Sequence, residues 1–138
     1  MTRSLSIKSE RTNIRKVEAF LLDLQKTVHL EPAVLDRILI SVTEAVNNGI
    51  IHGNKADPSK YVHITCTCFP DHARFEIRDE GQGFSPETVP DPRTDQNLLK
   101  EGGRGIFIIR SLMDTVVFEK EKDGMKIVMT ISWEGTTP

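Results

Sequence analysis

The chain has 138 residues, of which 38% are hydrophobic and 28% are charged, which indicates a globular domain with its own core and excludes a disordered protein. A net charge of −2 argues against nucleic-acid binding through bulk positive charge, and no apolar run approaches the ~20 residues of a membrane span. The N-terminus lacks the apolar stretch of a secretory signal, so we expect a cytoplasmic protein with neither a membrane nor a nucleic-acid partner.

The first elements expected along the chain are a short strand and a helix. Residues 4–8 alternate between polar and apolar side chains, which predicts a strand at the edge of a sheet. Residues 14–25 carry apolar side chains at steps of three and four, which predicts a helix with one buried face. Ser9 or Thr12 could cap the N-terminus of this helix, because a hydroxyl oxygen accepts hydrogen bonds from free peptide N–H groups.

A second helix is expected from Pro32 to about Gly53, and its polar residues are unusual. Asn47 and Asn48 stand side by side although Asn is a poor helix former. A solvated face with a frayed end would explain them. A cation site is the alternative, because a carboxylate and an amide oxygen one turn apart suit Mg²⁺. The polar residues that share one face at helical spacing are Arg37, Ser41, Glu44, Asn48 and His52.

Two pairs of strands are expected in the rest of the chain, separated by a loop and a helix. The loop covers residues 80–101 and is rich in Gly and Pro, which is typical of a lid or a binding loop. The helix that follows opens at Gly102 and Gly103. Turn residues separate the two members of each strand pair. The four strands are expected at residues 61–69, 74–79, 115–119 and 126–133.

This order of elements predicts an α+β fold in a single domain over residues 1–138. Strands that occur in neighbouring pairs favour a mixed or antiparallel sheet, and the helices are expected to pack on one of its faces as a two-layer sandwich. Cys66 and Cys68 lie two apart on a predicted strand, a spacing that rarely makes a good disulfide. A zinc site would need further ligands, so we expect reduced, buried thiols.

Two glycine-rich segments predict contact with a nucleotide. In Asp79-Glu80-Gly81-Gln82-Gly83, the glycines would let the backbone approach a flat ligand while the acid accepts a hydrogen bond. Adenine offers an amine donor where guanine presents an oxygen, so an aspartate there favours adenine. In Gly102-Gly103-Arg104-Gly105, a glycine turn enters a helix and would present free N–H groups to phosphate. Either segment alone could be a mere turn.

Together and in this order, the segments resemble the GHKL superfamily of ATPases and kinases, which has the Bergerat ATP-binding fold. Glu44 to Asn48 resembles the N box, Asp79 to Gly83 the G1 box and Gly103 to Gly105 the G2 box. Within the superfamily the chain is most similar to bacterial anti-sigma-factor serine/threonine kinases. The phrases that carry this resemblance are SVTEAVNNGIIHGN, IRDEGQGF and EGGRGIFIIRSLMD.

The resemblance implies a role for each motif residue. Glu44 is implied to be the catalytic base, Asn48 to hold Mg²⁺, and Asp79 to bind the adenine amine of ATP. Residues 85–101 are implied to form a lid over ATP. Met125 stands where many family members carry a threonine, so no side-chain contact to the base is expected from it. The remaining residues implied or considered for nucleotide binding are Asn47, His52, Lys55, Gly81, Gly83, Gly102, Gly103, Arg104, Gly105 and Ile106; His52 could equally be a structural hydrogen bonder.

The same resemblance implies an anti-sigma factor that is also a protein kinase. Such a protein would bind ATP and Mg²⁺, sequester a sigma factor, phosphorylate an anti-sigma-factor antagonist on Ser or Thr, and form a homodimer. The alternatives are a nucleotide-dependent protein-binding regulator without phosphotransfer, an ATPase or phosphatase-type regulator outside sigma-factor control, and an α+β domain whose glycines only make turns.

Overall fold

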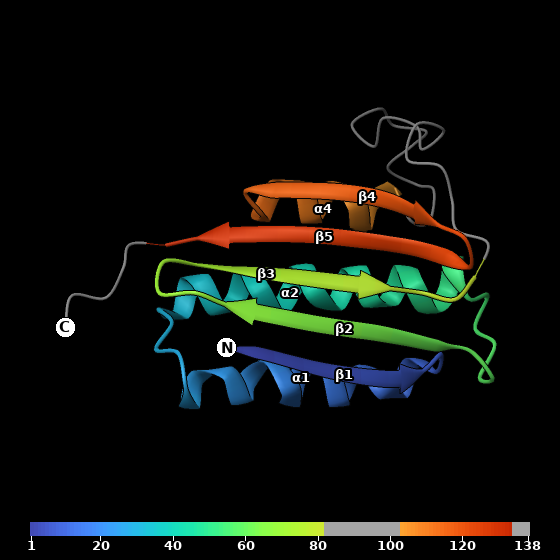
Figure 1. Ribbon diagram of the computed structural model, residues 1–138, viewed down its shortest axis with the longest axis horizontal. Helices are drawn as coiled ribbons and strands as arrows, with labels where there is room; N and C mark the ends of the chain where they lie inside the picture. Colours follow the sequence, from blue (N-terminus) through green and yellow to red (C-terminus); the bar gives the residue numbers. More distant parts are fainter. Residues whose placement is uncertain (82–102, 134–138) are drawn as a thin grey trace.

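The computed structural model describes residues 1–81 and 103–133, and they form two layers. One layer is a five-stranded antiparallel sheet, and the other consists of helices packed on one of its faces (Figure 1). This arrangement confirms the predicted α+β sandwich. The predicted lid, residues 85–101, lies outside the described residues. The elements are β1 (Thr2–Lys8), α1 (Ile14–Asp23), α2 (Pro32–Asn48), β2 (Tyr61–Cys68), β3 (His72–Arg78), α4 (Gly103–Leu112), β4 (Thr115–Glu121) and β5 (Gly124–Ser132).

The strands lie in the order β1-β2-β3-β5-β4, so β1 and β4 form the edges. Both predicted hairpins are present: β2 pairs with β3, and β4 pairs with β5. The pairing of β3 with β5 joins the two hairpins into one sheet and places Phe75 opposite Met129. Because side chains alternate along a strand, this register points one apolar set from every strand toward the helices.

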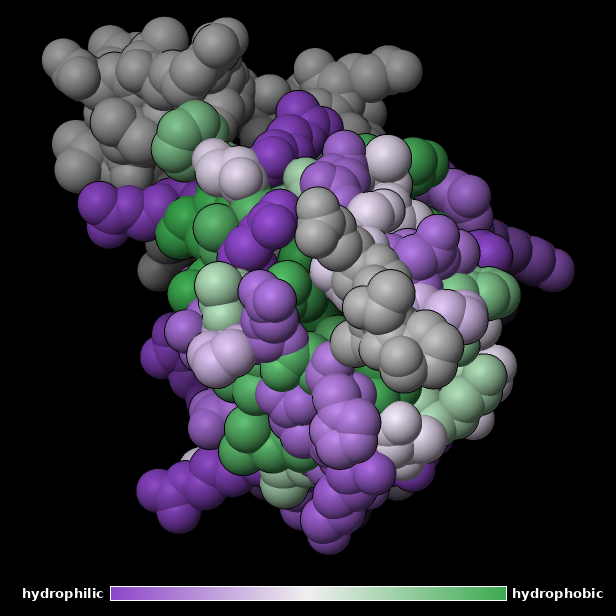
Figure 2. Space-filling view, turned by 90° about the vertical axis from the view of Figure 1, so that its left-hand side faces the viewer, coloured by the Kyte–Doolittle hydropathy of each residue, from purple (hydrophilic) through white to green (hydrophobic). Residues whose placement is uncertain are grey.

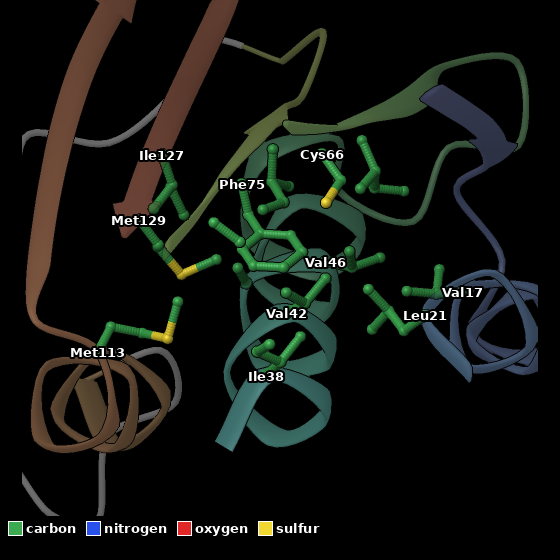
Figure 3. Close-up of a cluster of buried hydrophobic side chains, with 14 of the residues drawn as sticks. Val17, Leu21, Ile38, Val42, Val46, Cys66, Phe75, Met113, Ile127 and Met129 are labelled. Atoms are coloured by element: carbon green, nitrogen blue, oxygen red, sulfur yellow. The ribbon is translucent and has the colours of Figure 1, made fainter. Parts of the chain in front are cut away.

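The hydrophobic core fills the space between the sheet and α2. Phe75 projects from β3 onto α2 and lies among Val42, Val46 and Met129 (Figure 3). α1 packs at one flank through Val17 and Leu21, and Met113, directly after the end of α4, packs at the other flank. α2 is therefore the central helix, and its path determines where its C-terminal residues meet the sheet.

Replacing Phe75 by alanine is expected to lower the free energy of unfolding by about 3–5 kcal/mol, because the deletion leaves a cavity at the centre of the core. Urea unfolding followed by circular dichroism measures this loss. Phe69→Ala is the matched control, since Phe69 is 43% exposed, and we expect it to cost less than about 1 kcal/mol. Equal losses for the two variants would contradict the described packing.

The structure corrects one prediction and confirms another in the first half of the chain. Neither Ser9 nor Thr12 caps α1, since Asn13 occupies the cap position and makes no side-chain capping bond. Ser9 is buried instead, and its hydroxyl donates to the Lys60 carbonyl at 2.8 Å. Cys66 and Cys68 are free and buried, as predicted.

At the end of the molecule opposite the β4–β5 turn, the visible described residues form a surface of mixed hydropathy (Figure 2). In Figure 2, hydrophobic residues at this end alternate with hydrophilic ones. Among residues 1–81 and 103–133, no helix combines the length and apolar character that a bilayer crossing requires.

Candidate functional site

The C-terminal end of α2, the end of β3 and the β4–β5 turn lie at the same end of the molecule (Figure 1). The first turn of α4 lies beside them, because Gly105 there is next to Glu44 and Asn48 of α2. These segments carry the three predicted motifs, which are far apart in the sequence. The topology of the sheet and the direction of α2 bring them together.

The end of α2 widens into a π-helical turn over Gly49–Gly53 before the chain leaves the helix. The Asn54 N–H donates to the Gly49 carbonyl at 2.8 Å, and Lys55 then adopts a left-handed φ of 55° that turns the chain away. The helix was predicted to end near Gly53, and it does so without fraying. Single π-helical turns are rare and occur frequently at functional sites.

Asp79 is the buried acid of the site, with 4% of its surface exposed. The N–H groups of Gly81 and Met125 donate to its Oδ1 at 3.0 Å and 3.2 Å, and its own N–H donates to the Met125 carbonyl at 3.0 Å. Both bonds to the carboxylate use the same oxygen, so neither occupies Oδ2. Burial, the largest cause, raises the pKa of Asp79, and these two N–H donors oppose that rise.

Three glycines surround Asp79 and leave no room for a side chain. A Cβ on Gly53 would collide with the Asp79 carboxylate, and one on Gly124 would collide with the Asp79 carbonyl. A Cβ on Gly81 would collide with the carbonyl of Gly53. The π-helical turn, the end of β3 and the start of β5 can approach one another this closely because all three positions are glycine.

Gly105 brings α4 against the polar residues of α2. A Cβ on Gly105 would lie 3.0 Å from Glu44 Oε2, and 3.4 Å and 3.5 Å from the two amide atoms of Asn48. The carboxylate and the amide are thus neighbours beside the first turn of α4. The first four N–H groups of a helix have no partner within it, and in α4 they belong to Gly103, Arg104, Gly105 and Ile106.

The Asn48 side chain is the observation that tests whether this corner fits phosphate and a divalent cation. Asn48 is 5% exposed, and its Nδ2 finds no hydrogen-bond partner in the described part of the chain. A buried amide left unpaired is costly unless a ligand completes it. One end of the amide suits a phosphate oxygen, and the other end, with Glu44 nearby, suits a hard cation. The residues present therefore fit both groups.

The predicted polar stripe of α2 is not a solvated face. Ser41 and Asn48 are buried, and Arg37 donates from Nε to the Leu112 carbonyl at the end of α4 at 2.8 Å. The stripe faces α4, and this packing explains why polar residues interrupt an otherwise apolar helix. Because α4 packs on this stripe of α2, the stripe is not a solvated face with a frayed end, which was the alternative explanation.

The structure brings some predicted nucleotide-binding residues together and leaves others at the margin. Glu44, Asn48 and Gly105 meet at one corner. Ile106 lies in the first turn of α4, and its side chain is buried. Among the described residues, the side chains of Asn47, His52 and Lys55 make no hydrogen bond to the side chains of Glu44, Asn48 or Asp79, while Gly83 and Gly102 lie outside the described range.

Sequence analysis gave Asn54 no role of its own and included it only as the last residue of the phrase SVTEAVNNGIIHGN. Its side chain is completely buried and accepts a hydrogen bond from the Glu80 N–H at 2.8 Å, directly beside Asp79. Asn after Gly is an ordinary turn signal, so the sequence offered no sign of this contact. Sequence analysis also missed the backbone of Met125, whose N–H donates to the Asp79 carboxylate and whose carbonyl accepts from the Asp79 N–H.

Comparisons with known proteins agree with this geometry. The family model described as "Histidine kinase-like ATPase domain" matches residues 7–131. The anti-sigma F factor of Clostridium perfringens (strain 13 / Type A) is 34% identical over 127 residues, which cover 88% of this chain and 88% of that protein. The serine-protein kinase RsbW of Staphylococcus aureus (strain MSSA476) is 36% identical over 98 residues, which cover 66% of this chain and 61% of that protein.

Solved structures share the fold at low sequence identity. The RsbU and RsbW domains of Rv1364c from Mycobacterium tuberculosis align with a TM-score of 0.71 at 14% identity, over 99% of this chain and 35% of that one. The catalytic domain of histidine kinase ThkA aligns with a TM-score of 0.60 at 14% identity, over 97% of this chain and 99% of that one. The chain belongs to the histidine kinase-like ATPase family, and its relatives there include anti-sigma F factors and RsbW serine-protein kinases.

Proposed function

We propose that the chain is an anti-sigma factor and an ATP-dependent serine/threonine protein kinase. It binds ATP with Mg²⁺, sequesters a sigma factor, and phosphorylates an anti-sigma-factor antagonist on Ser or Thr. The observation that carries the proposal is the corner where Gly105 lies against Glu44 and Asn48, at the start of α4 and on the same side of the sheet as buried Asp79.

Asp79 selects the purine in this proposal. Its Oδ1 is held by the Gly81 and Met125 N–H groups, so Oδ2 is free of both donors and can accept the adenine amine. Guanine presents a carbonyl oxygen at the same place, which a carboxylate repels. Gly53 and Gly81 keep this edge of the pocket thin enough for a flat base to approach.

Asn48 and the first turn of α4 would hold the phosphates and Mg²⁺, and the bound Mg²⁺ would supply neutralisation of the phosphate charge. The helix N-terminus presents free N–H groups to the phosphate oxygens. Glu44 accepts the proton from the substrate hydroxyl while that oxygen attacks the γ-phosphorus and ADP leaves. Among described residues, no cluster of three His, Cys, Asp or Glu side chains could hold a metal alone, so Asn48 would hold Mg²⁺ only together with the nucleotide.

The name anti-sigma F factor supports a sigma factor as one proposed partner, and the name serine-protein kinase supports a protein substrate. The antagonist as that substrate and the cytoplasm as the location are parts of the proposal. A homodimer remains part of the proposal. The test is incubation of the purified chain with γ-labelled ATP, Mg²⁺ and a recombinant antagonist encoded in the same genome. We expect label on a Ser or Thr of the antagonist and none when GTP replaces ATP. ATP binding without transfer would instead support a nucleotide-dependent regulator.

Gly53→Ala is expected to weaken ATP binding by about tenfold or more, because the new methyl group collides with the Asp79 carboxylate and displaces it. Titration with a fluorescent ATP analogue measures the affinity. Gly49→Ala is the matched control from the same π-helical turn, since the atoms nearest to its Cβ would be side-chain atoms of Val62 and Asp79, at 3.3 Å or more. Equal affinities in both variants would contradict the proposed adenine site.

ATP affinity is also expected to fall on acidification at a higher pH than an ordinary aspartate would cause. Burial raises the pKa of Asp79 above its usual value of about 3.9, and a protonated Asp79 accepts hydrogen bonds from adenine less well. By the same linkage, protonation of Asp79 favours the folded state below the unfolded pKa, and this contribution is lost as pH rises through the folded pKa. Calorimetric ATP titrations between pH 4 and pH 8 test the expected fall in ATP affinity, and an affinity that stays constant over this range would contradict it.

A further inference from the structure

Asn54 connects four segments through one buried side chain. Its Nδ2 donates to Ser9 Oγ at 2.8 Å, beyond the end of β1, and to the Tyr61 carbonyl at 3.0 Å, at the start of β2. Its Oδ1 accepts from the Glu80 N–H at 2.8 Å, and its backbone N–H closes the π-helical turn. The side chain has no exposed surface, so water does not compete for these bonds.

The bond to Glu80 is one of three that orient the segment carrying Asp79. The Asp79 N–H donates to Met125 on β5, and the Gly81 N–H donates to the Asp79 carboxylate. Of these three N–H groups, only that of Glu80 is bonded to the chain leaving α2. Asn54 therefore fixes the distance between the end of α2 and the Asp79 carboxylate.

The Glu80 side chain strengthens the same link from outside. Its Oε1 accepts from the Tyr61 N–H at 2.7 Å, and its Oε2 lies 2.9 Å from His63 Nε2. The hydrogen bond with His63, the largest cause, lowers the pKa of Glu80. Glu80 is thus held on both sides, by Asn54 through its N–H and by β2 through its side chain.

We infer that Asn54 is a positioning residue for purine selection, which acts through the Glu80 peptide to aim Asp79 at the adenine amine. The inference rests on the proposed ATP-binding function. It also explains the residue type, because the position requires one acceptor and two donors on a short side chain. Aspartate keeps the acceptor but has no donor, and alanine has neither.

Asn54→Ala and Asn54→Asp separate positioning from stability. Both variants lose the donors to Ser9 and Tyr61, so both should unfold at lower temperature. Only alanine also loses the acceptor for the Glu80 N–H. We expect Asn54→Ala to reduce the ratio of ATP to GTP affinity by about tenfold or more and Asn54→Asp to retain most of it, both measured on folded protein.

Hydrogen exchange at the Glu80 amide reports the contact without any nucleotide. We expect slow exchange in the wild-type chain, exchange about tenfold or more faster in Asn54→Ala, and intermediate exchange in Asn54→Asp. Asn13→Ala is the matched control, since Asn13 donates to the Lys8 carbonyl at an exposed position, and it should change neither readout.

Three results would overturn the inference: fast Glu80 exchange in the wild-type chain, an unchanged ATP-to-GTP ratio in folded Asn54→Ala, or an equal loss of that ratio in both Asn54 variants. The wild-type exchange measurement decides the contact even if Asn54→Ala does not fold. Absence of ATP binding by the wild-type chain would refute the proposed function and this role in purine selection together. Slow Glu80 exchange would then show that the contact itself exists.

Discussion

Glu44→Gln is expected to reduce phosphoryl transfer to the antagonist by about 10²–10⁴-fold, which is the usual contribution of a positioned general base. Glutamine keeps the size of the side chain and its place beside Gly105, but it cannot take the hydroxyl proton. ATP affinity should stay within about threefold of wild type, because Glu44 acts on the attacking hydroxyl and does not contact the adenine ring in this proposal. Single-turnover transfer from labelled ATP, measured alongside ATP titration, separates the two effects.

Glu31→Gln is the matched control for Glu44→Gln, since Glu31 is exposed at the opposite end of α2. It should transfer phosphate at the wild-type rate. If Glu44→Gln retained the wild-type rate as well, Glu44 would not be the base, and the nucleotide-dependent regulator without transfer would become the better account.

Asp79→Asn is expected to weaken ATP binding by about 100-fold or more. An asparagine can keep an oxygen toward the Gly81 and Met125 N–H groups, which then turns its amide nitrogen toward the adenine amine. Two donors facing each other in a buried site cost more than a missing bond, and about 3 kcal/mol corresponds to 100-fold. Folding stability should be less affected, because the change removes a buried charge.

Isothermal titration with ATP and Mg²⁺ measures the affinity of Asp79→Asn. Asp36→Asn is its control, because Asp36 is exposed on α2 and should bind ATP like the wild-type chain. Wild-type affinity in Asp79→Asn would move the adenine site elsewhere on the protein.

Local sequence patterns predicted most of the fold. Alternation along residues 61–69 identified a core strand, because an antiparallel sheet covered on one face requires a buried residue at every second position. The candidate site was predictable where glycines let neighbouring backbone segments pack closely against each other. Glycines at positions 53 and 81 lie where the structure has no space for a side chain, and a Cβ on Gly105 would make a tight contact with Glu44, although Gly53 was predicted only as a helix end.

Contacts across the fold could not be predicted from local patterns. The polar face of α2 is buried because α4, more than fifty residues later, packs on it, as the bond from Arg37 to Leu112 shows. Ser9 had the right position for a helix cap, yet tertiary bonds to Lys60 and Asn54 use its hydroxyl instead. The contacts of Asn54 could not be predicted, because its partners come from β2 and from the end of β3.

A crystal structure of the chain with a non-hydrolysable ATP analogue and Mg²⁺ tests the central claim most directly. The account predicts the adenine amine within hydrogen-bond distance of Asp79 Oδ2, and the Asn48 amide and the first turn of α4 in contact with the phosphates and the metal. A nucleotide bound elsewhere, or bound here with Asp79 and Asn48 turned away from it, would contradict the account.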